Sequence, residues 1–154
     1  VGFDGHALKP GSVLRLGGID IEFDHSLEGH SDADVLLHAI SSALLGAAKL
    51  GDLGTHFPST SPEWSEIDST VILESSLGKV RDSGWGVDYI DATIVAQKPR
   101  LSIYLERMVQ RIAQILSTET GRINIKVTST DHVGAIGKGE GIAAQAIATL
   151  RLLS

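Results

Sequence analysis

The chain has 154 residues, of which 42% are hydrophobic, and its formal net charge at pH 7 is −6. This length and apolar content predict one domain over residues 1–154, and the acidic balance argues against nucleic acid as a partner. Cysteine is absent, which excludes disulfides, cysteine-ligated zinc and cysteine nucleophiles. No apolar run reaches about 18 residues, so no membrane span is expected.

Hydrophobic periodicity predicts both strands and helices. Alternating apolar residues indicate strands, and apolar residues at helical spacing indicate helices. Gly17-Gly18 predicts a hairpin, and Ser31 with Asp34 resembles a capping box at the start of a helix. The segment 51–68 holds two of the four prolines and predicts a loop. The expected elements, in chain order, are strands over 13–16 and 19–23, helices over 31–49 and 69–82, a strand over 87–97, a helix over 101–116, and strands over 123–127 and 142–152.

This order of elements predicts an α/β fold, built as an α+β sandwich. We expect a ferredoxin-like arrangement with the helices on one face of a mixed sheet. Only two links join strand, helix and strand, so a long doubly wound sheet is not expected. The sequence also lacks the G-x-G-x-x-G and Walker A patterns of nucleotide-binding loops.

Three residues near the N-terminus are candidate metal ligands. Asp4 and His6 are two apart, so an extended segment would point both side chains to one face. His38, on the first helix, could complete a set of two histidines and one carboxylate, which is common at catalytic zinc. Alternatively, Asp4 and His6 lie in a surface turn and His38 is a core residue. Asp34, one turn before His38, either orients its second nitrogen or serves the helix N-terminus.

Three further segments have both a functional and a purely structural interpretation. His30-Ser31 precedes the first helix, where free N–H groups favour anions or are simply capped. Residues 128–131, Thr-Ser-Thr-Asp, could hold phosphates and a divalent cation, or form a polar strand end. The glycine-rich loop 137–141 contacts a phosphate or only turns the chain. Residues 97–100 are basic but lack interleaved aromatics, which argues against stacking on nucleic acid.

Together these segments resemble the 2-C-methyl-D-erythritol 2,4-cyclodiphosphate synthase family. The match follows the family's order and spacing over nearly the whole chain. The H-S-D-x-D-V-x-x-H and L-G-D-x-G patterns are its most specific parts. The matching segments are Gly2–His6, His30–His38, Ala43–Ala47, Leu50–Gly54 with Phe57-Pro58, Ala96–Arg100 and Gly137–Ala143.

The resemblance implies a single catalytic domain that forms a homotrimer with active sites at the subunit interfaces. It implies a phosphorus–oxygen lyase of the non-mevalonate isoprenoid pathway. Such an enzyme converts 4-diphosphocytidyl-2-C-methyl-D-erythritol 2-phosphate to the cyclic diphosphate and CMP. Zinc would be held by Asp4, His6 and His38, and magnesium or manganese would bridge the diphosphate. A cytoplasmic location is expected, or a plastid in a plant or alga.

The resemblance also assigns roles to individual residues. His30 and Ser129 would stabilise the transition state, and Asp131 would face the second divalent ion. Backbone groups of residues 96–102 would read the cytosine. The residues expected to bind substrate are Ser31, Asp52, Leu53, Gly54, Phe57, Ser59, Ser61, Ala96, Gln97, Lys98, Pro99, Arg100, Leu101, Ser102, Thr128, Thr130, Ala135 and Lys138.

The chain departs from the family pattern at several positions. Asp131 replaces the usual Glu and is one methylene shorter, whereas Ser129 replaces Thr and keeps the hydroxyl. Lys138 replaces Arg, which exchanges a bidentate fork for a point charge. Almost no chain precedes Gly2, so a loosened Asp4–His6 segment is expected. Serines at 42, 59 and 61 replace common aspartates.

Two other functions are compatible with the same residues. The first is a zinc-dependent phosphoesterase acting on nucleotides. The second is a trimeric module that binds metal and nucleotide without turnover. Retention of His30 and of all three candidate ligands favours the synthase.

Overall fold

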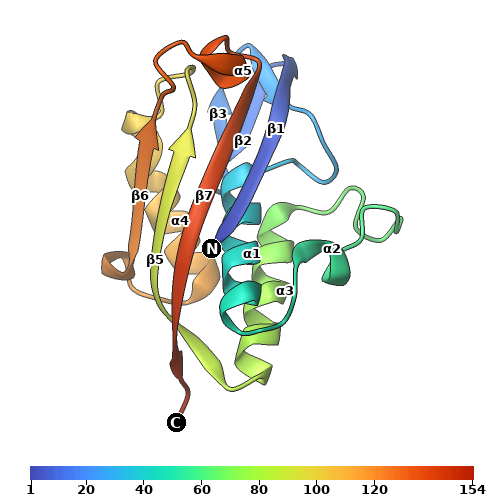
Figure 1. The fold of residues 1–154 in the computed structure, drawn as a ribbon, viewed down its shortest axis with the longest axis vertical. Coiled ribbons are helices and arrows are strands. Elements are labelled where there is room, and N and C mark those ends of the chain that lie inside the picture. Colours follow the sequence, from blue (N-terminus) through green and yellow to red (C-terminus); the bar gives the residue numbers. More distant parts are fainter.

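The computed structural model describes residues 1–154 and contains a five-stranded sheet whose strand order is β4-β1-β7-β5-β6. Only β5 and β6 run parallel; the other neighbours are antiparallel. The helices α1, α3 and α4 lie together on one face of this sheet (Figure 1). The predicted mixed sheet with helices on one face is therefore confirmed. The elements are β1 Gly2–Pro10, β2 Val13–Leu16, β3 Ile19–Glu22, β4 His25–Leu27, α1 Val35–Ala47, α2 Leu53–His56, α3 Ser69–Asp82, β5 Trp85–Val95, a 3₁₀ turn Ser102–Tyr104, α4 Leu105–Leu116, a 3₁₀ turn Thr120–Arg122, β6 Ile123–Thr128, α5 Gly134–Gly137 and β7 Gly141–Leu152.

The core lies between the helices and the sheet. On α1, Leu36, Ile40 and Leu44 recur every four residues and are fully buried. They face a sheet surface that includes Ile90 and Ile94 of β5, also fully buried. Burying each such side chain contributes roughly 1.5–3 kcal/mol. This shared core fixes α1 against the strands and so sets the position of its polar residues.

Strand β1 is firmly anchored. It pairs with β7 from Gly2 to Ala7, so the hydrogen-bonded ladder spans both Asp4 and His6. A Cβ atom at Gly2 would lie only 2.0 Å from the backbone oxygen of Ala39, which shows how closely β1 approaches α1. The expectation of a loosened N-terminal segment is therefore wrong, because pairing begins at the second residue.

Helix α1 begins at Val35, four residues later than the capping-box pattern predicted. Ser31 and Ala33 have positive φ angles of 61° and 55°, which are incompatible with a helix. Asp34 is the N-cap: its carboxylate accepts hydrogen bonds from the backbone N–H of Leu37 and also from Gly17 and Gly18. Asp34 therefore serves the helix start and the hairpin, and it does not orient His38.

Most other boundaries agree with the predictions, but α4 begins at Leu105 and not at 101, because a 3₁₀ turn, Ser102–Tyr104, precedes it. The helix over 69–82 is confirmed, as is the hairpin at Gly17-Gly18. The alanine-rich segment from residue 142 is a strand, as its period of two indicated. The predicted loop 51–68 contains the one-turn helix α2. Three elements were missing from the predicted order: the nine-residue strand β1 and the short elements β4 and α5. No helix has both the length and the apolar character needed to cross a membrane.

The second face of the sheet carries no helix from this chain (Figure 1). Large apolar side chains stand exposed on it. Phe3 of β1 is 66% exposed, Ile147 of β7 is 49% exposed and Tyr89 of β5 is 44% exposed. Large exposed apolar side chains gathered on one sheet face are typical of a surface for association.

Candidate metal centre

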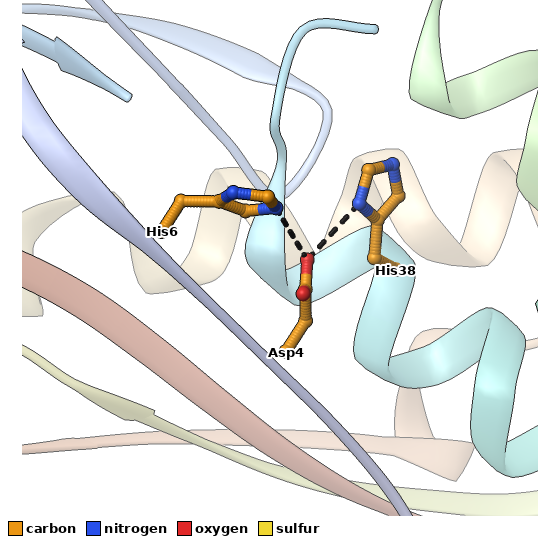
Figure 2. Close-up of side chains that lie close together, drawn as sticks. All are labelled: Asp4, His6 and His38. Carbon is orange, nitrogen blue, oxygen red and sulfur yellow. Dashed lines mark hydrogen bonds and ion pairs between the residues drawn. The ribbon is translucent and has the colours of Figure 1, made fainter. Parts of the chain in front are cut away.

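The three candidate metal ligands converge beside β1 and α1. Asp4 and His6 point from β1 toward His38, which comes from α1 (Figure 2). The Oδ2 atom of Asp4 lies 3.1 Å from Nε2 of His6 and 3.0 Å from Nδ1 of His38. One ligand atom from each residue falls within 4.8 Å of the others. The alternation predicted from D-x-H is confirmed, and the group is able to hold a metal ion.

The electrostatics of the group suit a cation. Burial raises the pKa of Asp4, but hydrogen bonds from His38 and His6 together with their charges outweigh burial and lower this pKa to about 2. The hydrogen bond to Asp4 raises the pKa of His6, against the opposing effect of burial. Asp4 is therefore a carboxylate at ordinary pH, held between two nitrogen donors. Such a set of one carboxylate and two imidazoles fits a catalytic divalent ion and leaves coordination positions open.

Each histidine is also held at its other nitrogen. The backbone of Glu28 helps to raise the pKa of His6. The neighbouring Gly29 lies so close that a Cβ there would sit 2.7 Å from Nδ1 of His6. His38 Nε2 lies 2.8 Å from the hydroxyl of Ser69, at the start of α3. Contacts of this kind set the orientation of metal-binding imidazoles.

A cavity of about 190 Å³ opens directly beside the metal group. It brings together predicted residues from three segments of the chain, including His30 and Phe57. Trp64 and Ile72 also line it and were missed by the sequence analysis. Trp64 packs edge-on against Phe57, with ring centroids 4.9 Å apart. The sequence signal that could have found Trp64 is a large aromatic residue within the otherwise polar segment 51–68. The lining residues are His6, His30, Ser31, His38, Leu53, Phe57, Ser59, Trp64 and Ile72.

Several residues predicted nearby already have partners within the chain. Asp52 is the N-cap of α2 and accepts hydrogen bonds from the N–H and hydroxyl of Thr55. The Ser31 hydroxyl donates to the backbone oxygen of Ile67. Gly54 and Ser61 lie in the same 51–68 segment, exposed and partly exposed respectively. This segment therefore forms an ordered wall with its own hydrogen bonds.

The predicted nucleotide-binding segments lie at a different place. Residues 96–102 and 128–131 follow the carboxyl ends of β5 and β6. The backbone N–H of Ala96 donates to Thr128 O at 2.9 Å, and that of His132 donates to Gln97 Oε1 at 3.0 Å. The structure thus joins these two segments to each other. Since β7 separates β1 from β5, they lie two to three strand spacings of about 4.8 Å from β1.

The residues of segments 96–102 and 128–131, here called the second group, differ in their exposure to solvent. Ser129 and Asp131 are exposed, and the N–H of Asp131 donates to the Ser129 hydroxyl at 3.2 Å. Lys98, Arg100 and Ser102 are also exposed, and Pro99 and Thr130 are partly exposed. The side chains of Ala96 and Leu101 are buried in the core, so only their backbone groups can face a ligand.

The glycine-rich loop 137–141 joins α5 to β7. Lys138 is the C-cap of α5, and its side chain is exposed. Ala135 of α5 shares a groove of about 500 Å³ with His6 and Phe3. This groove connects the α5 region with the metal group.

Fold and site define an α/β protein with an Asp/His/His group able to hold a metal ion. The model of the YgbB family matches residues 1–151, and the chain belongs to that family. It is similar to a 2-C-methyl-D-erythritol 2,4-cyclodiphosphate synthase of Geotalea daltonii, with 51% identity over 150 residues, covering 97% of this chain and 88% of that protein. A synthase of the same name from Pseudomonas putida is 49% identical over 149 residues, covering 97% of this chain and 95% of that protein.

Solved structures share the fold. The bifunctional IspDF of Campylobacter jejuni superposes with a TM-score of 0.95 at 37% identity, covering 99% of this chain; this chain spans 42% of that longer protein. A 2C-methyl-D-erythritol-2,4-cyclodiphosphate synthase with CDP bound gives a TM-score of 0.90 at 28% identity, with 97% of each chain covered. The family resemblance inferred from the sequence is confirmed.

Proposed function

We propose that this chain converts 4-diphosphocytidyl-2-C-methyl-D-erythritol 2-phosphate to 2-C-methyl-D-erythritol 2,4-cyclodiphosphate and CMP. This reaction belongs to the non-mevalonate isoprenoid pathway and makes the chain a cyclising lyase. The convergence of Asp4, His6 and His38 beside a cavity is the observation that carries the proposal. The names of the relatives at about half identity support it.

The reaction exchanges one phosphoanhydride bond for another. An oxygen of the substrate's 2-phosphate bonds to the β-phosphorus, and the bond from that phosphorus to the oxygen bridging it to the α-phosphate breaks. CMP leaves with that oxygen. Because little covalent chemistry is asked of the protein, catalysis depends on positioning and on neutralising phosphoryl charge.

The chain's own residues would supply this positioning. Asp4, His6 and His38 would hold zinc or another divalent transition ion, which supplies Lewis-acid stabilisation of phosphoryl oxygens. His30, exposed at the mouth of the cavity, would donate a hydrogen bond to the developing charge. The Ser129 hydroxyl would do the same from the end of β6. The exposed Asp131 carboxylate would face magnesium or manganese, and residues 96–102 would bind the cytidine.

We further propose that the 154 residues act as one catalytic domain in a homotrimer, which brings the second group of residues to the metal group of a neighbouring subunit. The separation of the two groups within one chain supports a shared site. The exposed apolar face around Phe3, Tyr89 and Ile147 supplies a surface for association. The cytoplasmic location expected from the sequence stays a prediction.

Product analysis tests the reaction. Purified protein with substrate, zinc and magnesium is expected to release CMP and the cyclic diphosphate in equal amounts, without inorganic phosphate. Release of inorganic phosphate would indicate the phosphoesterase alternative. Binding of CDP and metal without any product would indicate the non-catalytic module. Chromatography of the nucleotides with phosphorus NMR of the products distinguishes these outcomes.

A charged residue on the sheet face that carries no helix tests the proposal that neighbouring subunits share an active site. Ile147→Glu should convert the trimer to a monomer, because a carboxylate would be buried without a partner at the interface. Turnover should be lost, whereas the metal group, which lies within one chain, should keep its metal. Light scattering and metal analysis measure both effects. Val71→Glu, at a 41% exposed position on α3, is the matched control. A fully active monomer would contradict the model.

A further inference from the structure

The His38 ring is held at both nitrogens. Its Nδ1 atom lies 3.0 Å from Asp4 Oδ2, on the side of the metal group (Figure 2). Its Nε2 atom lies 2.8 Å from the Ser69 hydroxyl, on the opposite side. The His38 side chain is 12% exposed, so few other partners can reach it. Ser69 is 31 positions away in the sequence, and its side chain is fully buried.

Ser69 itself is fixed by Asp32. Its backbone N–H donates to Asp32 Oδ2 at 3.0 Å, and its hydroxyl donates to Asp32 Oδ1. Asp32 is anchored in turn, because it accepts from the backbone N–H of Asp34 at 3.2 Å and lies 3.7 Å from Nε of Arg15. The serine therefore cannot turn its hydroxyl freely toward other acceptors.

These contacts give the chain of hydrogen bonds a direction. A carboxylate only accepts hydrogen bonds, so the Ser69 hydroxyl donates its hydrogen bond to Asp32. The hydroxyl oxygen then presents a lone pair to His38. The His38 Nε2 atom then carries the proton that it donates to Ser69. The Nδ1 atom is then the nitrogen that faces Asp4 and the metal group, and it is the one left to ligate an ion that replaces its hydrogen bond with Asp4.

We propose that Ser69, held by Asp32, is a positioning residue that sets the tautomer and ring orientation of His38 for metal binding. The proposal rests on the proposed metal site and extends it by one residue. Ser69 is not itself a lining residue of the cavity or one of the three candidate ligands; behind the lining it contacts His38 Nε2 and, at 3.2 Å, the hydroxyl of Ser31. His38 is the only candidate metal ligand that Ser69 contacts, so its effect should appear first in the affinity for the metal.

The test compares metal affinity in matched serine variants. Ser69→Ala should weaken zinc binding by about 10- to 100-fold, the usual cost of losing an outer partner of a ligating histidine. Ser76→Ala is the control: Ser76 lies on the same helix, is equally buried and donates to the Ile72 carbonyl at 2.8 Å. It should leave zinc affinity unchanged. Ser69→Thr keeps the hydroxyl and should retain affinity within about threefold.

Zinc dissociation constants are measured by competition with a chromophoric chelator, and the stability of each metal-free variant by urea unfolding. Wild-type affinity in Ser69→Ala would overturn the proposal while leaving the metal site intact. Equal weakening in Ser69→Ala and Ser69→Thr would also overturn it, because the hydroxyl would then be irrelevant. Failure of the wild-type protein to bind zinc would overturn both the metal site and this proposal.

Discussion

His38→Ala is expected to abolish both metal binding and turnover. The wild-type protein should carry about one zinc per chain, since three protein ligands define a catalytic site. Removing one of them leaves only Asp4 and His6. The ion supplies several kcal/mol of charge stabilisation, and each 1.4 kcal/mol is about tenfold in rate, so turnover should fall at least about 10³-fold.

The measurement combines metal analysis of the dialysed protein with the CMP-release assay. His25→Ala is the matched control, because His25 lies on β4 and pairs with the exposed Asp24 outside the metal group. That variant should retain its zinc and its activity. Circular dichroism checks that His38→Ala remains folded. Full zinc occupancy in His38→Ala would show that the ion binds somewhere else.

Asp34→Ala is expected to cause the largest loss of stability. The Asp34 carboxylate is fully buried and accepts from Gly18 at 2.8 Å, Gly17 at 3.0 Å and Leu37 at 3.1 Å. Alanine would leave three buried N–H groups without an acceptor, at about 1–3 kcal/mol each. The expected loss is roughly 3–9 kcal/mol, a large part of the 5–15 kcal/mol typical of a domain.

Urea unfolding of the metal-free proteins measures this loss. Burial raises the pKa of Asp34 to about 6, against the lowering effect of its hydrogen bonds. A raised carboxyl pKa makes the unfolding free energy fall as pH rises from about 4 to 6, so the comparison belongs at about pH 8, where the group is charged. Asp52→Ala, at the exposed N-cap of α2, is the control and should cost no more than about 1 kcal/mol. Equal losses in both variants would contradict the role given to Asp34.

The sequence predicted local features with good accuracy. The helix over 69–82, the hairpin at Gly17-Gly18 and the strand from residue 142 follow from periodicity and turn residues, which depend on near neighbours. The alternation of β1 likewise placed Asp4 and His6 on one face before any partner was known. Start signals were less reliable. Ser31 resembles a helix cap, but Ser31 and Ala33 have positive φ angles. The helix therefore begins only after Asp34, which is its N-cap.

By itself, the sequence determined the layers of the fold, the metal-ligand types and the family. Only the tertiary structure decided which partner each polar side chain has: Asp34 serves the hairpin, and Ser69 reaches His38 across 31 positions. It also added Trp64 to the cavity wall. The physical reason is that periodicity records which side of an element is buried. Contacts between elements depend on their register and close packing, which no local pattern encodes.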